Sequence, residues 1–146
     1  VDPQMASDAI QNYIPDNNRS QLIKSKSNTI YLDAYNANPT SMENAIGFFE
    51  KVKSDKKILI LGDMLELGDD SEAEHIKLLN DIGSKDFDMV LLVGEELCRH
   101  NRNTDFLSFE NSIRAKEWLQ DNTIQNASIL IKGSRKIGLE ILTDQL

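Results

Sequence analysis

Two short stretches of the sequence place polar and charged side chains directly after buried apolar runs. "YLDAYNANP" (31–39) contains Asp33, Tyr35, Asn36, Asn38 and Pro39. "ILIKGSR" (129–135) contains Lys132, Gly133, Ser134 and Arg135. A carboxylate can accept hydrogen bonds from ribose hydroxyls, and a cation followed by backbone N–H groups at a helix start suits an anion. Both stretches are therefore candidate ligand contacts.

Structural explanations exist for most of these residues. Asn38 and Pro39 suit the N-cap and first residue of a helix equally well. Tyr35 could pack in the core or lie against a base, and "KGSR" could be a helix start with a solvated lysine. Asp33 is harder to explain in this way, because an acid at the end of a buried strand needs a partner or solvent. We expect it at the solvent end of its strand.

A third polar stretch, "GDMLELG" (62–68), brackets Asp63 and Glu66 with glycines. The glycines permit a tight turn, but a plain turn does not require both acids. We interpret His75 as a surface or packing residue and Cys98 as a small buried residue rather than a nucleophile. The sequence contains neither the P-loop pattern nor G-x-G-x-x-G, so the visible residues look like only part of a nucleotide site.

The composition excludes several classes of protein. With 146 residues, the chain is expected to be one domain, 1–146. A net charge of -8, without a basic stripe, argues against nucleic acid binding. No apolar run is long enough for membrane insertion. One cysteine and two histidines predict no metal site and suit a cytoplasmic location. Because the chain begins "VDPQ", we expect it to be a piece of a longer protein.

Hydrophobic patterning predicts alternating strands and helices. The expected strands are 29–33, 57–62, 88–94, 105–109 and 127–133. The expected helices are 5–13, 40–53, 71–83, 95–100, 112–120 and 134–146, with polar loop at 16–21. This alternation predicts a Rossmann-like α/β fold, a mostly parallel sheet of five to six strands with helices on both faces. Ligands bind at the carboxyl ends of such strands, so the polar stretches should share one edge.

Two helices carry specific expectations. The helix at 40–53 should begin at Asn38 and Pro39, with a capping box from Thr40 to Glu43. Its apolar face is Met42, Ala45, Ile46, Phe49 and Val52. The helix at 71–83 should begin with a capping box from Ser71 to Glu74. Its apolar face is Ala73, Ile76, Leu79 and Ile82.

From about Tyr13 to its end, the chain resembles the C-terminal domain of the Mur ligases. The resemblance is carried by "LDAYNANPTSMENAI", "LILGDMLELG" and "ILIKGSR" in this order. It is most specific to members that add D-alanyl-D-alanine to UDP-N-acetylmuramoyl-tripeptide in peptidoglycan synthesis. A second acid often precedes the aspartate in this family, so Leu32 is a departure that leaves Asp33 alone in that role.

The resemblance implies a fragment of a three-domain enzyme, with an N-terminal domain for the UDP-sugar and a central domain that carries the P-loop. ATP would be a substrate, and Mg²⁺ would be bound mainly by the central domain. Residues 33–39 named above would face the nucleotide. Lys132, Gly133, Ser134 and Arg135 would lie near the carboxylate of the dipeptide. No residue of this domain alone would be catalytic, so the isolated domain is expected to be inactive.

Two alternatives remain open at the level of sequence. The chain could be a free-standing nucleotide-binding module, because none of its polar residues forms a nucleophile and base pair. It could also belong to another Mur-type ligase, such as the enzyme that adds polyglutamate to folate. The "YNANP" and "KGSR" stretches argue against this second alternative, through the resemblance alone.

Overall fold

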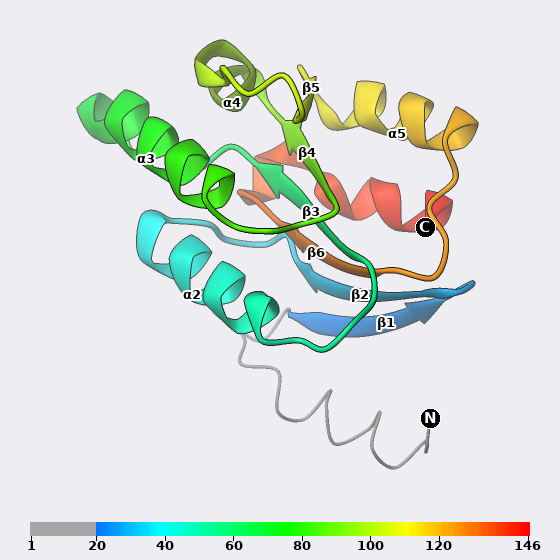
Figure 1. The fold of residues 1–146 in the computed structure, drawn as a ribbon. Coiled ribbons are helices and arrows are strands. Elements are labelled where there is room, and N and C mark those ends of the chain that lie inside the picture. Colours follow the sequence, from blue (N-terminus) through cyan, green and yellow to red (C-terminus); the bar gives the residue numbers. More distant parts are fainter. Residues whose placement is uncertain (1–19) are drawn as a thin grey trace.

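The computed structural model describes residues 20–146, and the helix predicted at 5–13 lies outside them. Its centre is a six-stranded sheet in the order β1-β2-β6-β3-β4-β5 (Figure 1). The strands are β1 Gln21–Ser25, β2 Asn28–Asp33, β3 Lys57–Gly62, β4 Met89–Val93, β5 Leu107–Phe109 and β6 Ser128–Lys132. Only β1 is antiparallel to its neighbour; the other four pairings are parallel. The predicted fold class is confirmed.

Helices cover both faces of the sheet. The α-helices are α2 Pro39–Glu50, α3 Ser71–Gly83, α4 Glu95–His100 and α5 Ser112–Asp121. The 3₁₀ helices are η1 Gly68–Asp70, η2 Arg135–Ile137 and η3 Leu139–Gln145. Residues of α2, α3 and α4 join one hydrophobic core, and residues of α5 and η3 join the other (Figure 1). No helix within residues 20–146 has the length and apolar character of a membrane span.

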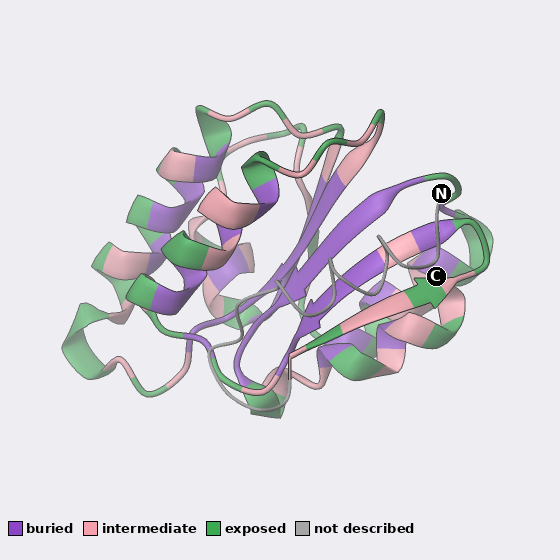
Figure 2. Ribbon diagram, turned by 90° about the horizontal axis from the view of Figure 1, so that it is seen from below, coloured by how far each residue is buried: buried purple, intermediate pink, exposed green. Residues whose placement is uncertain are grey.

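Alternation along the central strands supplies both cores. In β3, Leu59 and Leu61 face one core, whereas Ile58 and Ile60 face the other. All five residues of β6 are buried, and the central strands are buried along almost their whole length (Figure 2). Continuous apolar runs are typical of parallel strands that are covered on both faces, which explains why these strands were readable from the sequence.

The position of β6 determines which loops are neighbours. The chain passes from β5 through α5 and returns to the middle of the sheet, where β6 lies between β2 and β3. Lys132 consequently pairs with Asp33 on one side and Leu61 on the other. The polar stretches that follow these three strands therefore meet at one edge, as the sequence predicted.

Both predicted capping boxes are wrong. In α2, Asn38 is the N-cap: its side chain accepts from the Ser41 N–H at 2.8 Å, and Ser41 Oγ accepts from the Asn38 N–H at 3.0 Å. Thr40 already lies inside the helix, because the chain turns at Asn38. In α3, Ser71 is also helical, since η1 leads directly into it, and the N-cap Asp70 makes no side-chain capping bond.

The buried face of α3 also differs from the prediction. It consists of His75, Leu78, Leu79 and Ile82. Ile76 is 38% exposed and Ala73 is exposed. The predicted face shares Leu79 and Ile82 with the observed one, and it lacks His75 because a search for apolar residues passes over a histidine.

The two ends of the described chain differ from expectation as well. The predicted helix at 134–146 is replaced by η2 and η3, which are separated at Gly138 with a left-handed φ of 73°. Strand β1 was missed, and Gln21, assigned to the polar loop, begins it. Its residues are exposed or half-buried, so it lacks the apolar run that marks a central strand.

Phe49 provides a test of the α2 packing. Its fully buried ring lies 5.7 Å from the ring of Tyr31 and 6.0 Å from that of Phe87, between centroids. We expect Phe49→Ala to lower the free energy of unfolding by about 3 to 5 kcal/mol. Lys53→Ala, at an exposed position, should be nearly silent. Urea unfolding curves with equal midpoints for the two variants would contradict this packing.

Candidate site at the carboxyl edge of the sheet

A buried ion pair connects the ends of β2 and β6. Lys132 Nζ lies 2.7 Å from Asp33 Oδ2, and the side chains are 0% and 2% exposed, respectively. Lys132 also donates to the carbonyl oxygen of Asn36 at 3.1 Å. One expectation is corrected here, because Asp33 is not at the solvent end of its strand, and the alternative of a solvated Lys132 is excluded. The parallel register places them opposite each other, and each charge makes the burial of the other tolerable.

A second contact joins the same two stretches nearer to solvent. The guanidinium of Arg135 lies 5.1 Å from the ring centroid of Tyr35, in the geometry of a cation–π interaction. Arg135 is exposed and Tyr35 is half-buried. The residues predicted to face a nucleotide and those predicted to face a carboxylate thus form one cluster. The helix-dipole argument for "KGSR" does not hold, because η2 has only three residues.

Asp63 has a structural task that the sequence did not reveal. Its carboxylate accepts the N–H groups of Glu96 and Leu97 at the start of α4, both at 2.9 Å. Burial raises the pKa of Asp63, while these two hydrogen bonds act in the opposite direction. Gly94 has φ of 132° and lies so close to this carboxylate that a Cβ would collide with it. Glu66, by contrast, is exposed at a left-handed φ of 66°.

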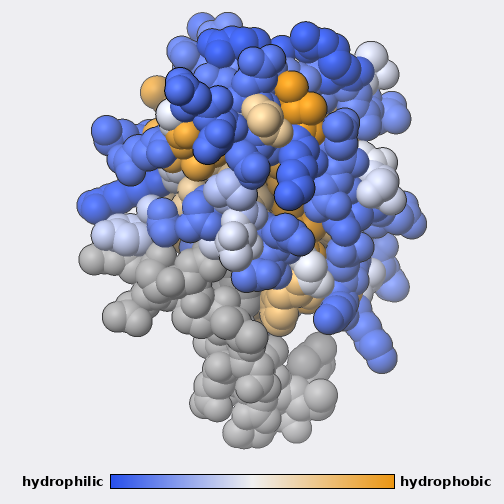
Figure 3. All heavy atoms as spheres, turned by 90° about the vertical axis from the view of Figure 1, so that its left-hand side faces the viewer, coloured by the Kyte–Doolittle hydropathy of each residue, from blue (hydrophilic) through white to orange (hydrophobic). Residues whose placement is uncertain are grey.

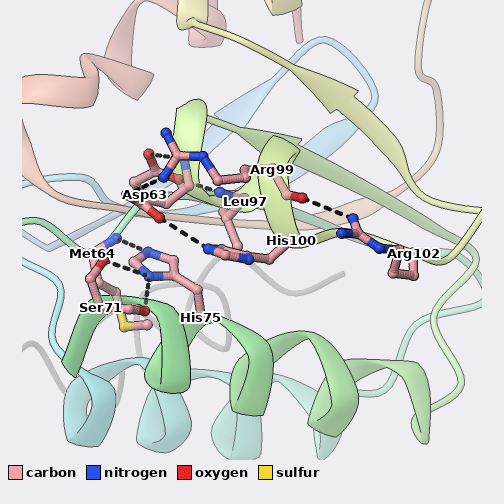
Figure 4. Close-up of polar contacts among 9 residues, drawn as sticks. Asp63, Met64, Ser71, His75, Leu97, Arg99, His100 and Arg102 are labelled. Atoms are coloured by element: carbon pink, nitrogen blue, oxygen red, sulfur yellow. Dashed lines mark hydrogen bonds and ion pairs between the residues drawn. The ribbon is translucent and has the colours of Figure 1, made fainter. Parts of the chain in front are cut away.

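The loop after β3, residues 63–67, is the second loop of the site, after the first loop that follows β2, and side chains from two other segments hold its backbone. Ser134 Oγ accepts the Leu65 N–H at 2.8 Å, and the Ser134 N–H donates to the Asp63 carbonyl at 3.1 Å. His75 Nε2 accepts the Met64 N–H at 3.0 Å (Figure 4). Gly133 allows β6 to approach Gly62, since a Cβ on Gly133 would lie 2.8 Å from the Gly62 Cα.

The sequence left His75 as a surface or packing residue, and the structure shows a fully buried packing residue whose hydrogen bonds were not foreseen. A signal was present: positions 75, 78, 79 and 82 follow the i, i+3, i+4, i+7 spacing of a buried helix face. A polar residue in such a row must find hydrogen-bond partners inside the protein.

An open cleft of about 750 Å³ lies beside these loops. One wall is the turn into α2, and the other comes from Leu67, Asp70 and Glu74. The first wall consists of Asn36, Asn38, Pro39, Thr40, Ser41 and Asn44. Asp33 does not line it. The face that carries α2 and α3 is mainly hydrophilic, with hydrophobic atoms in narrow seams (Figure 3).

The polar side chains that line the cleft are amides, hydroxyls and two carboxylates. None of the described residues that line it is a cation. Within residues 20–146, no group of three or more His, Cys, Asp or Glu side chains is arranged to hold a metal ion. Such a lining suits hydroxyl groups and the polar edge of a base better than phosphate groups, which require positive charge.

Comparison with known families gives a match along most of the chain. Residues 18–135 match the model of the family described as "Mur ligase, glutamate ligase domain". This chain belongs to that family. The resemblance seen in the sequence is therefore confirmed for a Mur ligase C-terminal domain.

Curated relatives and solved structures agree with this assignment. The UDP-N-acetylmuramoyl-tripeptide–D-alanyl-D-alanine ligase of Bacillus subtilis is 34% identical over 137 residues, which cover 88% of this chain and 30% of the relative. The ligase of the same name from Treponema pallidum is 31% identical over 121 residues, 78% of this chain and 26% of the relative. The Mur ligase domain described here therefore spans about a quarter to a third of their length.

Two solved structures share the fold. Crystal structure I of MurF from Acinetobacter baumannii has a TM-score of 0.76 and 28% identity, over 100% of this chain and 33% of that one. MurF ligase from Thermotoga maritima in complex with ADP has a TM-score of 0.72 and 22% identity, over 90% of this chain and 30% of that one. At that identity, the second comparison shows the fold alone.

The buried ion pair of this Mur ligase domain can be tested with a double-mutant cycle. We expect Asp33→Asn and Lys132→Met each to cost about 3 to 5 kcal/mol of unfolding free energy, because each leaves a buried charge uncompensated. The double variant should cost less than the sum of the two, since it removes both charges. Urea unfolding of the four proteins measures this coupling. Additive costs would show that the two side chains do not depend on each other.

Proposed function

We propose that residues 1–146 are the C-terminal domain of a three-domain, ATP-dependent ligase that adds D-alanyl-D-alanine to UDP-N-acetylmuramoyl-tripeptide in peptidoglycan synthesis. The observation that carries the proposal is the match to ligases of that name along 78% and 88% of this chain. The meeting of the three sequence motifs at one sheet edge supports it, because it makes a single site of them. The reaction belongs in the cytoplasm, where ATP is available.

In this proposal, the cleft receives the base and ribose of ATP. Asn36, Asn38 and Pro39 line the cleft and contact the nucleotide directly. Tyr35, which does not line the cleft, is assigned to the nucleotide through its place next to Asn36 in the sequence. Asp33 acts through Lys132, which holds the Asn36 carbonyl. Because no cation lines the cleft, the phosphates and Mg²⁺ are assigned to the central domain with its P-loop. The ADP bound by the Thermotoga maritima ligase supports a nucleotide substrate.

The same proposal places the carboxylate of the dipeptide beside "KGSR". Arg135 is the exposed cation at this point, and a guanidinium can bind a carboxylate through two parallel hydrogen bonds. Lys132, Gly133 and Ser134 shape the loop that presents it. Phosphorylation of the tripeptide carboxylate by ATP would allow the dipeptide amine to attack and phosphate to leave. The residues of this domain orient the dipeptide amine, and none of them needs to be the nucleophile or the base.

The decisive experiment measures phosphate release by the complete enzyme with ATP and UDP-N-acetylmuramoyl-tripeptide. We expect turnover to require D-alanyl-D-alanine and not to be supported by glutamate. The isolated 146-residue chain should show no ATP hydrolysis, because it lacks a P-loop. Glutamate-dependent turnover would indicate another Mur-type ligase. Micromolar ATP binding by the isolated chain, without turnover by the complete enzyme, would indicate a free-standing nucleotide-binding module.

The proposed role of Arg135 predicts a selective effect on the dipeptide. Arg135→Ala in the complete enzyme should raise the KM for D-alanyl-D-alanine roughly tenfold to a hundredfold, the effect of losing a charged hydrogen bond. The KM for ATP should change much less. Lys136→Ala is the matched control, since it removes the adjacent exposed cation. An equal rise in the KM for D-alanyl-D-alanine in both variants would show that Arg135 contributes only to the general surface charge.

A further inference from the structure

His75 is the one fully buried titratable residue on α3 among the described residues, and its ring has a defined hydrogen-bond role at each nitrogen. Nε2 lies 3.0 Å from the Met64 backbone nitrogen, and Nδ1 lies 2.7 Å from the Ser71 carbonyl oxygen (Figure 4). A backbone N–H can only donate and a carbonyl can only accept. This geometry assigns a lone pair to Nε2 and a proton to Nδ1, which also lies 3.3 Å from Ser71 Oγ.

These two bonds fix one wall of the cleft. Met64 begins the loop that leads to Leu67, and Ser71 begins the helix that carries Glu74. Leu67, Asp70 and Glu74 together form the cleft wall opposite Asn36 and Asn38. His75 joins the start of the loop to the start of the helix, and between them the Asp70 N–H also donates to the Leu67 carbonyl at 3.2 Å. The first wall is held independently, by Lys132 on the Asn36 carbonyl.

The remaining polar backbone groups near this wall do not duplicate the role of His75. The Leu65 N–H is held by Ser134, which follows β6 rather than α3. The Asp63 carboxylate already accepts the N–H groups at the start of α4. The N-cap of α3 has no side-chain hydrogen bond that would hold the start of this helix. Without the acceptor at Nε2, the Met64 N–H would be a buried donor lacking its partner, and the loop would lose its connection to α3.

We propose that His75 is a positioning residue that sets the width of the nucleotide cleft through the Met64 amide. It touches neither the reacting atoms nor the phosphates, and it acts through the wall 67–74. This inference rests on the proposed function for its kinetic consequence, but not for its structural one. Removal of the acceptor should weaken nucleotide binding and leave the chemical step nearly unchanged.

Two substitutions separate the two nitrogens. In His75→Gln, the longer amide can place its oxygen near the position of Nε2 and accept from Met64. In His75→Asn, the shorter amide can reach only toward the Ser71 carbonyl. His100→Asn is the matched control: the same change at the other histidine, which pairs with Glu96 on α4 and lies outside the cleft lining.

In the complete enzyme, His75→Asn should raise the KM for ATP roughly threefold to tenfold, as expected for one hydrogen bond, with kcat within about twofold. His75→Gln and His100→Asn should remain within about twofold of the wild type in both constants. A loss confined to kcat, or equal KM values in the Gln and Asn variants, would overturn the proposal. Failure of the wild-type enzyme to turn over would instead count against the proposed function.

Two measurements on the 146-residue chain test the contact without any activity. Exchange of the Met64 amide hydrogen should be roughly threefold to tenfold faster in His75→Asn than in His75→Gln, with core strand amides unchanged. In the wild type, nitrogen NMR of the His75 ring should show the proton on Nδ1. A proton on Nε2 would overturn the proposal even if His75→Asn failed to fold.

Discussion

The contact between Asp33 and Lys132 is the constraint on which the site depends. Neither side chain could be buried alone at the end of a strand, because an unpaired charge in the protein interior is too costly. As an ion pair with 2.7 Å between Lys132 Nζ and Asp33 Oδ2, they hold the ends of two parallel strands together. The spare donor capacity of the lysine then holds the Asn36 carbonyl, so the ion pair also determines the path of the first loop.

The order of the strands in the sheet is a second constraint on the site. β6 comes last in the sequence but lies between β2 and β3, so the segment that follows it reaches both loops of the site. Lys132 holds the first loop, and Ser134 holds the second through the Leu65 amide. Gly133 stands between them, where a side chain would collide with Gly62. The loop after β2 and the start of the loop after β3 are thus positioned by contacts between residues about 70 to 100 positions apart.

The features of the fold that the sequence predicted are those that leave a periodic pattern of apolar residues. The central strands were readable because runs such as that at 57–62 are apolar on both faces, and β3 has those bounds. Strand β1 was not, because half-exposed residues leave no such run. The partnership of Asp33 and Lys132 depends on register across the sheet, which no local pattern encodes. The sequence could not choose between surface and packing for His75 for a related reason: hydrogen bonds to Met64 and Ser71 offset the cost of its burial, and only the tertiary structure supplies the first of these partners.

The distribution of positive charge explains how such a domain could work with a partner domain. Lys132 is committed to Asp33, Arg135 stacks against Tyr35 outside the cleft, and the described lining contains no cation. A cleft of this kind can recognise hydroxyl and amide groups, but it cannot neutralise a triphosphate, so in the proposed enzyme the central domain must meet the phosphate charge. Weak contact would suit the proposed enzyme, in which this domain closes over the nucleotide and releases it in every cycle. The missing P-loop and the uncharged first wall fit the same proposal, in which the central domain binds the phosphates and this domain contacts the base and ribose.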